Sequence, residues 1–321
     1  MPDNRLGTVL NPRTLQDAID QAKLADVLGY DSIWSTDGMS RDAFVLLGAC
    51  AAATTRVGLG TAIVTILPRH PSVMARSALS LNEVSGGRFR LGIGTGHRAG
   101  VENALGIEWT EPKETMREYI DLLRGLFDGP VKHHGKRWDV EWGYPQPIPP
   151  APSIHLAALN PPLMELAGEI ADGVVLWMAT PEYIRDVVVP KCLAGRQKAG
   201  KTLDGFDIIA PVPAAVTDDV PAARKVMKAE LARYATIPFY RREFMNAGYR
   251  AELDSFDAVR ANGGDIGEAL PDRLADSLGV AGSAAEVRAF IKHFRDAGAN
   301  LPLVRPIYGP DVARTLREAI V

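Results

Sequence analysis

The sequence predicts an α/β fold, a (β/α)8 TIM barrel with a helical insertion after strand 7. Apolar runs with strand character alternate with amphipathic helical segments along most of the chain, which is the element order of a parallel α/β sheet. The length of 321 residues also suits one barrel, typically about 250 residues long, that carries an insertion. We therefore expect a single domain over residues 1–321, with the insertion at about 217–282. An open doubly wound sheet is the alternative architecture.

The first part of the chain is expected to supply four strand–helix pairs. A helix over residues 14–28 follows a short first strand, because apolar side chains recur on one helical face and Gly29 then acts as a stop signal. The other elements expected here are a strand at 30–34, a helix at 42–54, a strand at 56–65, a helix from Pro71 to the glycines at 85–87, a glycine-containing strand around 91–94 and an amphipathic helix at 112–127.

The alternation of strands and helices continues after a proline-rich segment, residues 144–152. We interpret this segment as a long loop because the same order of strand and helix is found on its far side. Ser283 and Glu286 form a capping box, S-x-x-E, that predicts the start of a helix after the insertion. The remaining expected elements are strands at 154–159, 173–177, 207–216 and 301–307, and helices at 162–171, from Pro181, and at 310–320.

Composition excludes several classes of function. The net charge is −3 and the basic residues are dispersed, so we expect no binding to nucleic acid or to an anionic membrane surface. The N-terminal segment lacks the pattern of a signal peptide, and no apolar run approaches the length of a membrane span. The two cysteines, Cys50 and Cys192, show no metal-ligand spacing. A reduced, cytoplasmic protein without a metal site is the expectation.

The run "LGIGTGH", residues 91–97, places three glycines two positions apart. A dinucleotide fingerprint needs G-x-G-x-x-G with a helix beginning at the glycines, and here the next helix begins only near Pro112. Because side chains alternate along a strand, Gly92 and Gly94 instead leave one face of the strand bare. That face admits either a flat ligand or a bulky neighbouring helix, and the residues alone leave both readings open.

Several linked motifs resemble the luciferase-like monooxygenase superfamily, most closely its branch that depends on the deazaflavin coenzyme F420. The similarity covers most of residues 1–180, and a weaker similarity covers residues 279–300. It is carried by "YDSIWSTD" (30–37), "RVGLGTAIV" (56–64), "RHPSVMARSALSLNEVSGGRFRLGIGTG" (69–96), the helix ending "REYIDLLRGLF" (117–127) and "ELAGEIADGVVLW" (165–177).

The resemblance implies a cofactor site at the carboxyl ends of the barrel strands. In the family a non-prolyl cis peptide supports the cofactor ring, and the matching bond here joins Ala62 to Ile63. The resemblance also places Thr95 and Gly96 at the ring and assigns the cofactor phosphate to backbone N–H groups of two loops. The matching loop residues are Ala157, Ala158, Leu159 and Asn160 in one loop, and Met178, Ala179 and Thr180 in the other.

Two residues are the candidates for catalysis. Asp37 matches the aspartate of the family's W-x-x-D-H motif, although Gly38 stands where the motif has histidine. As an alternative, Asp37 serves only as a helix or turn cap. His97 follows Thr95 and Gly96, and an imidazole titrates near neutrality and can carry a proton there. Its alternative role is that of an ordinary loop histidine, which is also how we interpret His133 and His134.

The leading hypothesis is therefore an F420-dependent oxidoreductase that transfers hydride between the deazaflavin and a small organic substrate. An FMN-dependent monooxygenase of the two-component type, supplied by a separate reductase, is the first alternative. A barrel that binds a cofactor or metabolite without catalysis is the second. By analogy with the family we also expect a homodimer.

Overall fold

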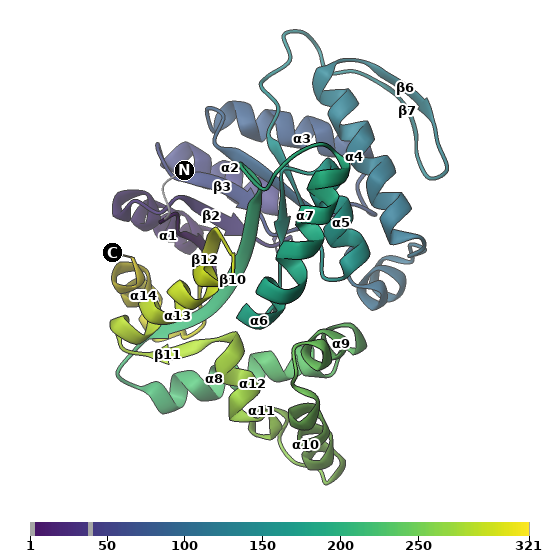
Figure 1. Cartoon of the computed structure of the whole chain (residues 1–321). Helices are drawn as coiled ribbons and strands as arrows, with labels where there is room; N and C mark the ends of the chain where they lie inside the picture. The colour runs from purple at the N-terminus through teal and green to yellow at the C-terminus, as the bar shows by residue number, and fades with distance from the viewer. Residues whose placement is uncertain (1–3, 38–40, 321) are drawn as a thin grey trace. The chain divides into compact units, whose positions relative to one another are not determined.

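The computed structural model describes residues 4–37 and 41–320, and its strands and helices follow one another in the order of a (β/α)8 TIM barrel (Figure 1). The predicted fold class is confirmed. The barrel strands are β1 (Gly7–Val9), β2 (Ser32–Ser35), β3 (Gly58–Thr61), β5 (Phe89–Gly94), β8 (Ser153–Ala157), β9 (Gly173–Val175), β10 (Asp207–Val216) and β12 (Leu301–Pro306).

The helices begin and end at residues with clear capping roles. Thr14 accepts a hydrogen bond from Asp17 N–H at 3.0 Å where α1 begins, and Gly29 ends that helix with a φ of 82°. The helices between the barrel strands are α1 (Leu15–Leu28), α2 (Ala43–Ala53), α3 (Pro71–Val84), α4 (Pro112–Asp128), α5 (Pro161–Ile170), α6 (Pro181–Tyr183), α7 (Val189–Lys198), α13 (Ala284–Asp296) and α14 (Val312–Ala319).

The chain divides into two compact units. The larger contains residues 14–175 and 191–207, and the smaller contains residues 1–13, 176–190 and 208–321. In the larger unit β2, β3, β5, β8 and β9 pair in parallel in that order. The short strand β4 (Val64–Thr65) also pairs with β5. The strand expected at 56–65 is thus two strands, β3 and β4, with a break at Ala62 and Ile63.

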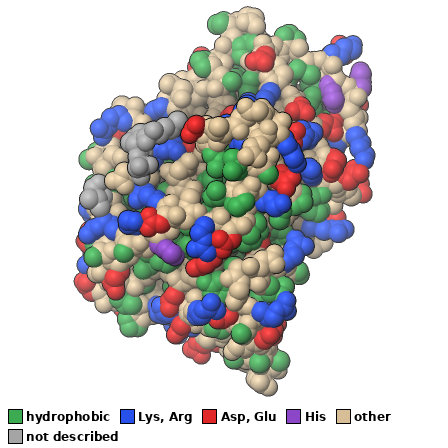
Figure 2. Space-filling model, in the orientation of Figure 1, with side chains coloured by type: hydrophobic (Ala, Val, Ile, Leu, Met, Phe, Trp, Pro, Cys, Tyr) green, Lys and Arg blue, Asp and Glu red, His purple; other side chains and the backbone are tan. Residues whose placement is uncertain are grey.

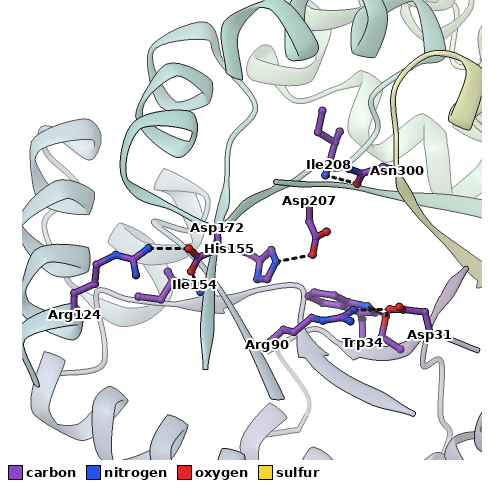
Figure 3. Close-up of polar contacts among 11 residues, drawn as sticks. Asp31, Trp34, Arg90, Arg124, Ile154, His155, Asp172, Asp207, Ile208 and Asn300 are labelled. Carbon is purple, nitrogen blue, oxygen red and sulfur yellow. Dashed lines mark hydrogen bonds and ion pairs between the residues drawn. The ribbon is translucent and has the colours of Figure 1, made fainter. Parts of the chain in front are cut away.

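Buried polar side chains in the larger unit form a connected network (Figure 3). His155 of β8 and Asp207 point at one another, with 3.1 Å between Nε2 and Oδ2. The His155 ring also meets the ring of Trp34 edge-on. Trp34 donates a hydrogen bond to Ser32, and Ser32 donates to Asp31. The network therefore joins strands that are far apart in the sequence.

Gly60 makes room for Trp34 in this network. A Cβ atom on Gly60 would lie 2.3 Å from Cε3 of Trp34, and Trp34 is fully buried. We expect Gly60→Ala to lower the free energy of unfolding by about 1 to 3 kcal/mol, the usual cost of overpacking. Trp34→Phe should reduce that cost. A double-mutant cycle measured by urea unfolding tests this, and strictly additive effects of the two substitutions would contradict it.

The smaller unit contains β1, β12 and β10, which pair in parallel in that order. The insertion after β10 is helical, as predicted, and its helices gather together in Figure 1. They are α8 (Val220–Ala235), α9 (Pro238–Asn246), α10 (Arg250–Ala261), α11 (Ile266–Ala269) and α12 (Asp272–Leu278). The chain then returns through β11 (Val280–Gly282), which pairs with β10.

The prediction that His133 and His134 lie in a loop is wrong. They belong to β6 (Val131–His134), which pairs antiparallel with β7 (Asp139–Trp142). In Figure 1 this hairpin extends beside α4.

The structure also bears on three expectations from composition, which concern the distribution of charge, membrane spans and the two cysteines. Figure 2 shows acidic and basic side chains interspersed over the visible face. No helix among residues 4–37 and 41–320 is long and apolar enough to cross a membrane. Cys50 and Cys192 are both buried free thiols, and burial raises the pKa of each to about 12.

Candidate cofactor and active site

The break between β3 and β4 contains the expected non-prolyl cis peptide, which joins Ala62 to Ile63. The end of β2 fixes this break by three hydrogen bonds. Ala62 N–H donates to the Ser35 carbonyl at 2.8 Å, Thr36 Oγ1 donates to the Ala62 carbonyl at 2.9 Å, and Asp37 N–H donates to the Ile63 carbonyl at 3.1 Å. The two peptide units at the break are therefore held in one orientation at the carboxyl end of the strand.

In the structure, residues at the break between β3 and β4 lie against the face of β5 that Gly92 and Gly94 leave without side chains. A Cβ atom on Gly92 would lie 1.8 Å from the carbonyl oxygen of Thr61, and one on Gly94 would lie 2.9 Å from Cδ1 of Ile63. The hypothesis that a flat ligand rests directly on Gly94 is thus corrected, because the Ile63 side chain lies there. The crowding partner is the neighbouring strand and not a helix, so the glycines serve the site by accommodating the segment that carries the cis peptide.

Thr95, Gly96 and His97 follow β5 directly. Gly96 has a φ of 71°, a conformation that favours glycine, and a Cβ there would lie 3.0 Å from Cγ2 of Thr65. Thr95 and Gly96 are half-buried and His97 is exposed. The protein around His97 nevertheless desolvates its ring enough to lower its pKa below the usual 6.5. The imidazole is therefore neutral at pH 7 and can accept a proton.

Asp37 makes the contacts expected of a helix cap. Its Oδ1 accepts a hydrogen bond from Ala43 N–H at 3.2 Å, and its Oδ2 lies 3.3 Å from Nη2 of Arg69. Arg69 also pairs with Asp42 at 2.6 Å, and its carbonyl accepts a hydrogen bond from Tyr119. The side chain of Asp37 is 15% exposed. Gly38, where the family motif has histidine, lies outside the described residues.

The first predicted phosphate loop, residues 157–160, is only partly available for a ligand. Ala158 N–H donates to the Val175 carbonyl at 3.3 Å, so this predicted donor is already engaged. Asn160 caps α5, because its Oδ1 accepts a hydrogen bond from Leu163 N–H at 3.1 Å. The loop therefore ends at a helix N-terminus, where backbone N–H groups favour an anion.

The second predicted phosphate loop lies in the smaller unit. Met178 has a φ of 53°, which is uncommon for a residue other than glycine and tends to occur at functional sites. Thr180 then caps the helix that opens at Pro181, accepting a hydrogen bond from Tyr183 N–H at 3.3 Å. Met178, Ala179 and Thr180 are all buried.

The structure thus brings together Asp37, Ala62, Ile63, Thr95 and Ala157 within the larger unit. Thr36 and Tyr119, which orient this region, were not predicted. Thr36 directly follows β2, but nothing in the sequence shows that its hydroxyl reaches the Ala62 carbonyl. A polar strand end with a neutral imidazole and few charges fits a planar cofactor. Among residues 4–37 and 41–320, no group of three or more acidic, histidine or cysteine side chains has the arrangement of a metal site.

Comparisons with known proteins identify the family of the chain. A family model described as luciferase-like monooxygenase matches residues 1–301. A 5,10-methylenetetrahydromethanopterin reductase of Methanolobus tindarius is 28% identical over 308 residues, covering 92% of each chain. The coenzyme F420 dependent tetrahydromethanopterin reductase of Methanopyrus kandleri has a similar structure, with a TM-score of 0.83, 23% identity and coverage of 98% of this chain and 97% of that one.

A second similar structure contains FMN. It is the oxygenating constituent of 3,6-diketocamphane monooxygenase from Pseudomonas putida in complex with FMN, with a TM-score of 0.70, 21% identity and coverage of 94% of this chain and 91% of that one. The family model spans nearly the whole sequence and includes every predicted site residue. The chain therefore belongs to the luciferase-like monooxygenase family.

Proposed function

We propose that this protein is an F420-dependent oxidoreductase that transfers hydride between the bound deazaflavin and a small organic substrate. The observation that carries the proposal is the break between β3 and β4 at Ala62 and Ile63, held by three hydrogen bonds with residues 35–37 and accommodated by Gly92 and Gly94. The extended similarity to methylenetetrahydromethanopterin reductases supports the choice of F420. When bound, F420 supplies hydride chemistry, because its ring carries carbon where a flavin has nitrogen.

The residues of the chain have separate parts in this proposal. Ala62 and Ile63 support the cofactor ring from behind, and Thr95 and Gly96 line its edge. Asp37 contacts the ring edge, and Ala43 N–H and Arg69 hold its carboxylate oxygens in place. His97 relays the proton. Two loops are the candidates for the cofactor phosphate, residues 157, 159 and 160 in the larger unit and residues 178–180 in the smaller unit. Each loop ends at a helix N-terminus, where backbone N–H groups favour an anion.

Titration of the purified protein with each cofactor tests the choice between deazaflavin and flavin. We expect saturable binding of F420, followed by tryptophan fluorescence, and much weaker binding of FMN. Tight binding of FMN with none of F420 would instead support the monooxygenase, for which the FMN-bound structural relative provides the precedent. A separate reductase would then be needed to supply reduced flavin.

His97→Ala is expected to lower kcat by about a hundredfold, within the usual range for general acid–base catalysis, while F420 binding survives. Because the pKa of His97 is lowered, its neutral form persists below pH 6.5. Substrate oxidation, which needs a proton acceptor, should therefore stay constant near pH 7 and decline only at more acidic pH. The decline should disappear in the variant. Unchanged turnover in His97→Ala would remove His97 from the mechanism.

The proposal also includes the oligomeric state of the protein and its location in the cell. We expect a cytoplasmic homodimer, by analogy with the family, and sedimentation velocity tests the dimer. The non-catalytic alternative predicts cofactor binding without turnover. Loss of turnover in His97→Ala or in Asp37→Ala, with F420 binding retained, would exclude that alternative.

A further inference from the structure

A cavity of about 480 Å³ lies in the smaller unit, lined by α13, the end of α14 and the segment before β1. This volume falls within the usual range of small-molecule sites. One part of its lining is apolar and consists of Leu6, Ile291 and Ala319, all of which are buried. The other part is mainly basic and includes one carboxylate, that of Asp296. The cavity therefore presents both an apolar surface and a cationic surface to the same space.

The basic part comes from one face of α13. Arg288, Lys292 and Arg295 line the cavity at spacings of four and three residues, which places them on the same side of a helix. Lys292 is paired with Asp296 at 2.7 Å. Among the described residues, no carboxylate lies within ion-pair distance of either arginine. Arg288 donates instead to the Glu318 carbonyl at 2.7 Å, and Arg295 donates to the Arg5 carbonyl at 2.9 Å.

Arg295 is the most unusual member of this set. Its Nε is buried and has no hydrogen-bond partner among the described residues, although a guanidinium N–H that is removed from water costs free energy unless it is paired. Desolvation by burial also lowers the pKa of Arg295. A cation in the last turn of a helix is favoured by the helix dipole. The dipole, however, supplies no counter-ion for the guanidinium.

We propose that this cavity binds a small organic anion, with its charged group at Arg288 and Arg295 and a short apolar body against Leu6, Ile291 and Ala319. A carboxylate or a phosphate would accept hydrogen bonds from the two guanidinium groups. The site lies at the amino ends of the strands, because Leu6 precedes β1 and α13 ends before β12 begins. Barrel enzymes perform their chemistry at the opposite ends of the strands, so the anion is an additional ligand and not the hydride substrate.

Isothermal titration calorimetry of the full chain tests the proposal with three probes, hexanoate, hexyl phosphate and hexan-1-ol. We expect saturable binding of at least one anion, and binding of the alcohol at least about tenfold weaker, which corresponds to about 1.4 kcal/mol. The tighter of the two anions identifies the head group as a carboxylate or a phosphate. Equal binding of the alcohol, or no binding of either anion at millimolar concentration, would overturn the proposal.

Single arginine substitutions test where the anion binds. Arg288→Met and Arg295→Met are each expected to weaken anion binding by about tenfold or more, the effect of losing a charge-assisted contact. Arg273→Met removes the same charge from α12, where Arg273 is exposed and paired with Glu252, and should leave the affinity unchanged. Circular dichroism confirms folding, and Arg288→Met carries the test if Arg295→Met does not fold. Anion affinity that is unchanged in a folded arginine variant would overturn the assignment.

Two further measurements complete the test. One asks whether the anion and F420 bind at separate sites, and the other asks whether a carboxylate of the chain itself pairs with the arginines. F420 affinity should be the same with and without saturating anion, and direct competition would overturn the placement at the amino ends of the strands. Asp3 lies outside the described residues and is next to Asn4 in the sequence. Asp3→Asn should leave anion affinity unchanged, whereas a tenfold gain would show that a carboxylate of the chain itself satisfies the arginines.

Discussion

Gly92→Ala is expected to lower the free energy of unfolding by about 3 kcal/mol or more, at or above the upper end of the usual cost of overpacking. The added Cβ would lie 1.8 Å from the Thr61 carbonyl oxygen, and backbone moves away less readily than a side chain does. Thr61 and Gly92 are also joined by two hydrogen bonds, from Gly92 N–H to Thr61 Oγ1 at 2.8 Å and from Thr61 Oγ1 to the Gly92 carbonyl at 2.7 Å. Urea unfolding measures the loss.

Gly48→Ala is the matched control for this prediction. Gly48 lies inside α2, and an added Cβ would have no neighbour within 4 Å. Because glycine is unfavourable in a helix interior, this variant should gain about 0.5 to 1 kcal/mol. If Gly92→Ala were as stable as Gly48→Ala, the close approach of Thr61 to the glycine strand would be wrong.

Glu243→Gln is expected to stabilise the protein at alkaline pH. Glu243 of α9 is 4% exposed, and neither carboxylate oxygen has a hydrogen-bond partner among the described residues. Desolvation raises its pKa from 4.5 to about 9, against a smaller opposing effect of Arg242. Tyr183 and Tyr240 are the buried titratable groups that interact electrostatically with it. The folded protein therefore holds this side chain as a neutral acid at pH 7.

The direction of the pH effect follows from proton binding. The unfolded chain releases the Glu243 proton near pH 4.5, whereas the folded protein retains it up to about pH 9. Stability is therefore greatest below pH 4.5 for this group and falls as pH rises through this window, by up to about 1.4 kcal/mol per unit. We expect Glu243→Gln to be more stable than the parent by up to about 5 kcal/mol at pH 8, an order-of-magnitude value, with little difference at pH 4.5.

Thermal unfolding of both proteins across this pH range checks the prediction. Glu268→Gln, an exposed substitution in the same insertion, is the control and should leave the pH dependence unchanged. Parallel stability curves for the parent and Glu243→Gln would mean that Glu243 is ionised or hydrated in the folded protein.

The order of the barrel elements could be predicted because each element has a local signal. Hydrophobic periodicity, the capping box at Ser283 and the helix-opening prolines lie within a few residues of the elements that they define. The hairpin at 131–142 could not be predicted because its strands are only four residues long and β6 contains a single apolar residue, Val131. A short two-stranded segment beside a helix leaves little pattern in the sequence.

The site was harder to predict because its geometry depends on contacts between strands. The spacing of Gly92 and Gly94 showed that one face of the strand is bare, but only the neighbouring strand shows that Ile63 fills the space above Gly94. The position of the cis peptide came from family resemblance and not from composition. The left-handed conformation of Met178 and the burial of Glu243 have no local sequence signal at all.

A crystal structure of the protein with F420 bound tests the central claim most directly. We expect the deazaflavin ring to lie against the Ala62–Ile63 segment, with Thr95 and Gly96 at its edge and His97 within reach of the transferring carbon. A ring bound elsewhere, with the 62–63 segment covered by side chains of the protein itself, would contradict the account.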